Sequence, residues 1–175
     1  LQTIVSRNVT PFHPLVVSVT EVHGGDVWNV VPAEAGFQGT VRYFHREDGD
    51  LAAERFRTIV EQTAAAYGIA ASVDWDDFQD PLVSDPALIE PVCAHIPQYA
   101  SLAPIMPSMA GEDFAEYAKV TRPVFAFVGS NGTPGCADWH SPRFVGFDET
   151  VRTGADFYAN AALDVLDALR VSGAR

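Results

Sequence analysis

Residues 14–44 read PLVVSVTEVHGGDVWNVVPAEAGFQGTVRYF, and this stretch decides the fold of the first half of the chain. Residues 14–22 are rich in Val and Thr, a composition typical of a strand. In residues 36–44 apolar and polar side chains alternate, which also predicts a strand. Gly24-Gly25 and Pro32 lie between the two segments, so we predict that the strands pair as a long hairpin.

The segments around this hairpin extend the pattern. Residues 1–9 resemble the tail of a helix, and residues 50–67 form an amphipathic helix that ends at Gly68. Residues 69–75 alternate again and predict a third strand. The order α-β-β-α-β lacks only a leading strand to form the split β-α-β motif of ferredoxin-like domains.

A second piece follows the two prolines between residues 80 and 86. Here we predict a helix over 86–96 capped by Asp85, a short helix over 112–119 and a last helix over 148–171. The last helix has an apolar stripe that we expect to be buried, made of Val151, Ala155, Tyr158, Ala162, Val165 and Leu169.

The second piece contains one candidate strand, the apolar run 123–128, which suits a buried parallel strand. One strand is too few for a sheet. The first helix also begins at Leu1 without a preceding cap residue. From both signs we expect the chain to be a truncated or processed portion of a longer protein.

The composition limits the classes of function. The chain has 175 residues, a hydrophobic content of 47% and a formal net charge of −12, which disfavours binding to nucleic acid. No apolar run is long enough to span a membrane, and no signal peptide is visible. Two cysteines, Cys93 and Cys136, are interpreted as reduced thiols, so we expect a cytoplasmic protein.

The long loop 129–147 follows the predicted buried strand, where α/β proteins place their sites. Its His140 precedes Ser141-Pro142, so we expect its backbone in an extended turn, and its imidazole could ligate a metal or lie exposed. Cys136 is four residues away but lacks the further ligands that a zinc site requires.

Other polar residues have both a structural and a functional interpretation. Asn29 interrupts an apolar run and needs a partner, and Arg42 could be solvated or could bind a carboxylate. Glu112 and Asp113 begin a short helix and suit its dipole. The sequence shows no partners for three further histidines, which we interpret as structural or exposed: His13, His45 and His95.

Five segments, in this order, resemble one family: LQTIVSRNVTPFHPLVVSV, VHGGDVWNVVPAEAGFQGTVRYF, MAGEDFAEY, PVFAFVGSNG and CADWHSPRFVGFDE. They are similar to the hippurate hydrolase and auxin-conjugate hydrolase branch of the aminoacylase/carboxypeptidase metallopeptidases. The resemblance covers essentially the whole chain. It implies an α/β fold made of an α+β lid and part of an α/β catalytic domain.

By this resemblance residues 1–79 are a ferredoxin-like lid that lacks its first strand and through which subunits form a homodimer. Residues 80–175 are the C-terminal part of a zinc-peptidase-like three-layer catalytic domain. The implied reaction is hydrolysis of N-acyl amino acids, in which two divalent ions, zinc or manganese, activate a water and a glutamate is the general base. That glutamate and most metal ligands are expected upstream of Leu1, so no catalytic residue is expected in this chain.

The resemblance also assigns site residues. His140 in WHSPRF matches the last metal ligand, and Asn29 in WNVVP matches a lid asparagine that reaches the neighbouring subunit's site. Arg42 resembles an arginine that binds the substrate carboxylate, and Gly111 and Glu112 belong to a segment that lines the pocket. Gly111 stands where serine is more usual.

Two hypotheses follow from the sequence. In the first, the parent protein is a metal-dependent amidohydrolase. In the second, this chain alone retains no metal, is inactive and serves as a dimerisation or interaction module, because one imidazole cannot hold a two-metal centre.

Overall fold

The computed structural model describes residues 1–104, 106–133 and 135–173. Ile105 and Pro134, which fall in predicted loops, lie outside the described residues. Two compact units form: the first is Leu1–Leu82 with Pro107–Glu116, and the second is Val83–Met106 with the chain from Tyr117 onward. The division into domains 1–79 and 80–175 stays a prediction about the intact protein.

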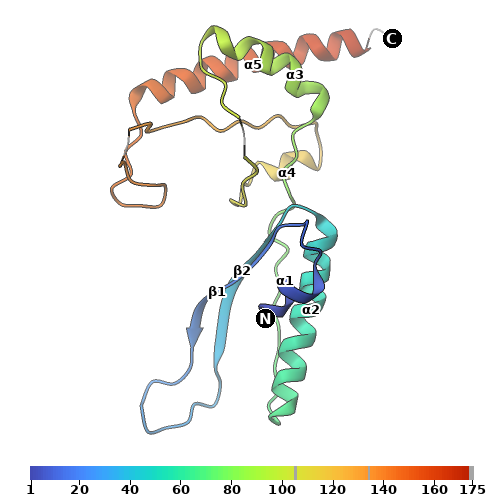
Figure 1. Cartoon of the computed structure of the whole chain (residues 1–175), viewed down its shortest axis with the longest axis vertical. Helices are drawn as coiled ribbons and strands as arrows, with labels where there is room; N and C mark the ends of the chain where they lie inside the picture. The colour runs from blue at the N-terminus through green and yellow to red at the C-terminus, as the bar shows by residue number, and fades with distance from the viewer. Residues whose placement is uncertain (105, 134, 174–175) are drawn as a thin grey trace. The chain divides into compact units, whose positions relative to one another are not determined.

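The first unit contains the predicted hairpin. Strands β1 (Leu15–His23) and β2 (Gly36–Tyr43) pair antiparallel, from Leu15 opposite Tyr43 to His23 opposite Gly36 (Figure 1). The register shifts between Val19 and Glu21. Close to this irregularity a Cβ on Gly39 would come within 1.9 Å of the Ser18 carbonyl oxygen. Glycine is therefore required there by the close approach of the two backbones.

Two helices pack against the hairpin and close a small core. They are α1 (Thr3–Asn8) and α2 (Arg46–Ala66), and α2 runs alongside the strands in Figure 1. The buried cluster consists of Ile4, Leu15, Val17 and Ala52. The predicted end of α2 is confirmed: Gly68 has a φ of +69°, and the amide of the next residue bonds back to the Ala64 carbonyl.

The third predicted strand, residues 69–75, is not formed. One apolar residue of the alternating pattern still packs against the first unit. Trp75 is half-buried and lies edge-on against Phe56 of α2, with ring centroids 5.5 Å apart. A strand also needs a neighbour for its hydrogen-bond ladder. The two-stranded sheet is β1–β2, and no other described residue offers this segment a ladder.

The second unit is built on helices α3 (Pro86–His95) and α5 (Asp148–Gly173), which pack against each other. A short η1 (Ile96–Gln98) follows α3, and α4 (Ala115–Ala118) lies where the chain passes between the units. The Asp85 cap is confirmed, since its carboxylate accepts the Ala87 amide at 2.8 Å.

The predicted buried face of α5 is wrong. Of the predicted stripe only Val165 is half-buried, and Val151, Ala155, Tyr158, Ala162 and Leu169 are exposed. Among the residues of α5 whose burial is described, the buried one is Asp164, which bonds to His95 of α3. Apolar side chains lie on more than one face of α5, so periodicity alone does not identify the face that packs.

The apolar run 123–128 also does not form a strand. It lies beside the residues before α3: the Asp85 amide bonds to the Pro123 carbonyl at 2.8 Å, and the Phe125 amide bonds to Ser84 Oγ at 3.0 Å. The mixed α/β class is thus confirmed with one two-stranded sheet. No described helix is long and apolar enough to cross a bilayer.

Candidate functional site

Arg42 connects β2 to the segment that carries Gly111 and Glu112. Its side chain is exposed, and Nη1 donates a hydrogen bond to the Met109 carbonyl at 2.6 Å. The structure therefore brings the predicted substrate-binding arginine next to the predicted pocket segment. This bond uses one of the five guanidinium N–H groups, and the planar fork suits a carboxylate at the others.

Glu112 and Gly111 have local structural roles. Glu112 Oε1 accepts the Phe114 amide at 3.2 Å, and the Glu112 carbonyl accepts the Ala115 amide at 3.1 Å, so this residue caps α4. A Cβ on Gly111 would lie 3.1 Å from Gln79 Oε1. A serine there would fit once the flexible Gln79 side chain gave way.

Asn29 is exposed in the loop that joins β1 to β2. The strands end at the pair His23–Gly36, whereas Arg42 pairs with Val16 near the other end. Six residues separate positions 36 and 42, and at about 3.4 Å per residue the loop begins roughly 20 Å from Arg42. Asn29 and Arg42 of one chain thus lie at opposite ends of the hairpin.

His140 lies in the predicted loop, whose ends are joined. The Phe147 amide bonds to the Ser130 carbonyl at 3.0 Å, and Thr150 Oγ1 bonds to the same oxygen at 3.2 Å. Within the loop, Asn131 Nδ2 donates to the Ala137 carbonyl at 3.1 Å. These bonds present the DWHSP segment on a braced loop.

The backbone at His140 corrects the expectation of an extended turn. Its φ is +64°, in the left-handed region, because it is the third residue of a turn closed by Ser141 N and the Asp138 carbonyl at 3.2 Å. Pro142 restricts the residue directly before it, Ser141, and leaves His140 free to turn. Left-handed geometry costs a residue with a Cβ about 1–2 kcal/mol.

The described residues do not form a two-metal centre around His140. His140 is exposed, and its ring lies over Trp139 with centroids 6.3 Å apart. Cys136 is an exposed free thiol. Among the described residues no His, Cys, Asp or Glu joins His140 in a group of three metal-ligand side chains. We therefore derive no catalytic step through metal from this chain.

A different cluster was missed by sequence reasoning. His13 Nδ1 lies 3.0 Å from Asp48 Oδ2, and the rings of His13 and His45 are 4.3 Å apart. His95 likewise bonds to the buried Asp164. The predicted hairpin is the signal that could have revealed the first cluster, because residues 13 and 45 lie just beyond the first pair of its ladder, Leu15 opposite Tyr43.

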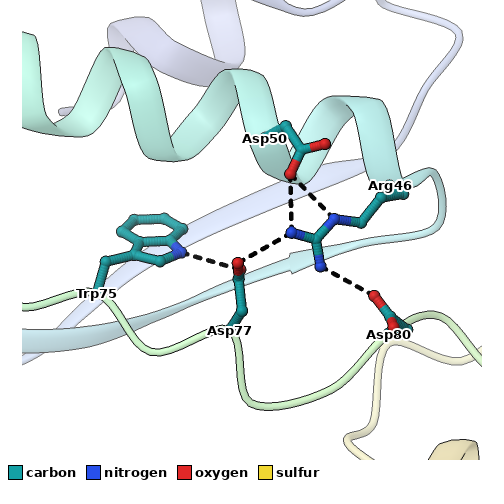
Figure 2. A network of polar contacts seen from close by, with 5 residues as sticks. All are labelled: Arg46, Asp50, Trp75, Asp77 and Asp80. Atoms are coloured by element: carbon teal, nitrogen blue, oxygen red, sulfur yellow. Dashed lines mark hydrogen bonds and ion pairs between the residues drawn. The ribbon is translucent and has the colours of Figure 1, made fainter.

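A surface network of charges connects the start of α2 to the extended segment that follows it (Figure 2). The Arg46 guanidinium bonds to Asp50, Asp77 and Asp80, each at 2.8–2.9 Å. Trp75 Nε1 donates to Asp77 at 3.1 Å. The bonds from Arg46, and next from Trp75, lower the pKa of Asp77, and the three carboxylates raise that of Arg46. The network holds residues 75–80 where a ladder is missing.

The comparisons with known proteins agree on one family. Residues 8–164 match the peptidase family M20/M25/M40. An N-acetyl-L-cysteine deacetylase of Bacillus subtilis is 39% identical over 160 residues, which cover 90% of this chain and 37% of that protein. An IAA-amino acid hydrolase of Arabidopsis thaliana is 29% identical over 98% of this chain and 41% of that protein.

A solved structure is also similar. A dinuclear metal-binding M20 peptidase from Bacillus subtilis superposes with a TM-score of 0.74 and 31% identity, covering 88% of this chain and 43% of that one. The chain thus spans less than half the length of these relatives.

Proposed function

Since the chain belongs to the peptidase family M20/M25/M40, we propose that the protein carrying it hydrolyses the amide bond of small N-acyl amino acids with two divalent metal ions. The match over residues 8–164 is the observation that carries this proposal. The names of the relatives, a deacetylase of N-acetyl-L-cysteine and a hydrolase of IAA-amino acids, support this substrate class. Hippurate-like conjugates belong to the same chemical class.

In this proposal His140 supplies one metal ligand. The loop bonds and the turn define the backbone at His140, and its imidazole is exposed and accessible to a metal ion. Zinc or manganese, when bound, would polarise the acyl carbonyl and provide a nucleophilic water. The other ligands and the general base would come from outside this chain.

Arg42 and Asn29 would hold the substrate. The guanidinium of Arg42 would pair with the amino-acid carboxylate next to the segment of Gly111 and Glu112, with the Met109 carbonyl orienting it. Asn29 lies at the other end of the hairpin, about 20 Å away by strand rise. We therefore propose that Asn29 serves the site of a second copy in a homodimer.

The test is complementation between two inactive variants of the full-length protein. Asn29→Ala and His140→Ala are each expected to abolish hydrolysis of N-acetylcysteine or hippurate. Co-assembled as mixed dimers, they should regain part of the activity, because the Asn29→Ala subunit keeps its His140 and receives Asn29 from its partner. Cysteine or glycine release measures the reaction.

Matched controls make the result decisive. Asn131 lies in the same loop as His140, and Asn131→Ala removes its hydrogen bond to the Ala137 carbonyl. This variant should lose only part of the activity, because the loop is less well held but His140 remains. Full activity of the His140→Ala variant with both metals retained would refute the ligand assignment. Mixed dimers as inactive as the two parent variants would refute the site shared between subunits. The proposed amidohydrolase activity would still be tested by the unmodified protein and by each single variant.

A second candidate function is self-association of this chain alone. The hairpin loop exposes Trp28 at 96% and Val31 at 91%. Both strands of the two-stranded sheet also have an open edge, which recruits other strands. Sedimentation at micromolar concentration should show a dimer, and Trp28→Ser should shift it toward monomer. A monomeric unmodified chain would contradict this candidate.

A further inference from the structure

We infer that the base of the β1–β2 hairpin carries a site for one divalent transition-metal ion of the zinc type, held by His13, His45 and Asp48. The site lies within the first unit, and His140 is not among its three ligands. The side chains come from three places in the chain: the residues before β1, those after β2 and the first turn of α2.

The hairpin register brings the two histidines together. Leu15 and Tyr43 form the first pair of the ladder, and just beyond it the rings of His13 and His45 lie 4.3 Å apart.

The backbone around each histidine holds it there. His13 is the last residue of a turn, in which its amide bonds to the Thr10 carbonyl at 3.0 Å. Pro14 follows it. His45 is extended, with φ −120° and ψ 128°, and its carbonyl accepts the Asp48 amide at 3.0 Å. That bond places Asp48 in the first turn of α2, beside the hairpin base.

The distances suit a shared cation. One ligand atom from each of the three side chains lies within 4.8 Å of the other two, and His13 Nδ1 is 3.0 Å from Asp48 Oδ2. In a tetrahedral zinc site with bonds of about 2.0–2.1 Å, neighbouring ligand atoms lie roughly 3.3 Å apart. A rotation of the exposed His45 ring would close the remaining gap, and water would fill the fourth position.

The chemistry of the donors favours zinc over harder ions. Two imidazoles and one carboxylate form a set that zinc uses, whereas magnesium and calcium select oxygen ligands. Asp48 is only 6% exposed, so a cation there is partly shielded from water. The neighbouring cation, Arg46, is bonded to Asp50, Asp77 and Asp80 rather than to Asp48 (Figure 2). The net charge of −12 adds a general attraction for cations.

The experiment is zinc titration of the tag-free 175-residue chain by calorimetry, with thermal unfolding in parallel. We expect about one zinc ion per chain at this site, and a rise in Tm because the ion binds the folded state. His45→Ala is the first variant, since His45 is exposed and outside the core. We expect it to weaken zinc binding by more than about 100-fold, since loss of a residue that merely orients a ligand already costs about 10- to 100-fold.

Asp48→Asn is the second variant, because it keeps the size of the side chain and replaces the anionic ligand. It should weaken zinc binding to a similar degree while circular dichroism shows the fold intact. His23→Ala, at the opposite end of the same hairpin, is the matched control and should bind zinc as the unmodified chain does. His140→Ala should also leave this site unchanged, which separates the inference from the proposed function.

Two results would overturn the inference. One is a chain that takes up no zinc, which would mean that His13 and Asp48 form only a hydrogen-bonded pair. The other is zinc binding that survives both His45→Ala and Asp48→Asn, or that magnesium reproduces equally, which would indicate general attraction to an acidic protein.

Discussion

The two units of the molecule differ in how their predicted elements are completed. In the first unit β1 and β2 supply each other's hydrogen bonds, and α2 covers the face that carries Leu15 and Val17. In the second unit α3 and α5 form as predicted, yet the apolar run 123–128 has no ladder. A helix satisfies its backbone internally, whereas a strand needs a second segment. Helices are therefore correct in both units and strands only where both partners are present.

The largest expected effect is a change that breaks the hairpin. Gly39→Ala would drive a Cβ to 1.9 Å from the Ser18 carbonyl oxygen, so a strand must shift. We expect the first unit to lose about 3 kcal/mol in its free energy of unfolding. Urea unfolding measures this loss. Gly36→Ala in the same strand, where a Cβ meets nothing within 4 Å, is the control and should change little.

The second unit has its own polar link between helices. Asp164 of α5 is 7% exposed and bonds to His95 of α3. Asp164→Ala removes a charged hydrogen-bond partner, so we expect a loss of about 2 kcal/mol, confined to the second unit. Hydrogen exchange of α3 and α5 would report it. Asp167→Ala, an exposed neighbour on α5, should cost much less, and equal losses would contradict the assignment.

The effect of a Gly→Ala substitution in a helix on stability can be compared between the two units. Alanine in a helix gains about 1 kcal/mol over glycine, but a Cβ on Gly49 would meet the Tyr43 ring at 2.4 Å. We expect Gly49→Ala to destabilise the first unit by about 1 kcal/mol net. Gly154→Ala in α5 meets nothing within 4 Å and should stabilise the second unit. Thermal unfolding of both variants measures the difference, and equal signs would refute it.

Arg46→Ala tests the network of Figure 2. Exposed ion pairs contribute little each, so we expect a loss of about 1 kcal/mol or less in global stability. The local effect should be clearer, since residues 75–80 have no ladder. Faster hydrogen exchange there and a change in Trp75 fluorescence would measure it. Arg152→Ala on α5 should leave both signals unchanged.

The smallest expected effect is on pH dependence. Hydrogen bonds from Arg46 and Trp75 lower the pKa of Asp77, and Arg122, with the Ala87 amide, lowers that of Asp85. A lowered folded-state pKa contributes stability above the unfolded value of about 3.9, and this contribution is lost as pH falls through the folded value. Below pH 4 we expect residues 75–80 in the first unit and the start of α3 in the second to become less protected. Faster local hydrogen exchange would measure this change. In Arg46→Ala only the first effect should disappear.

The sequence provided candidate residues for the site but did not show how they are arranged. The resemblance assigned roles to Asn29, Arg42 and His140, and the structure adds the Arg42–Met109 bond and the left-handed turn at His140. Neither could be read from composition, because each depends on backbone that is distant or locally strained. The cluster of His13, His45 and Asp48 was missed because His13 is 32 positions before His45 in the sequence, while Asp48 is 3 positions after it.

The sequence by itself determined the helices, the cap at Asp85, the stop at Gly68 and the hairpin, because these rest on local hydrogen bonds and on alternation that both strands carry. Only the tertiary structure decided which face of α5 is buried, that residues 69–75 and 123–128 remain without a ladder, and that His13 meets Asp48. Those outcomes depend on which surfaces meet, and a local pattern does not specify its partner.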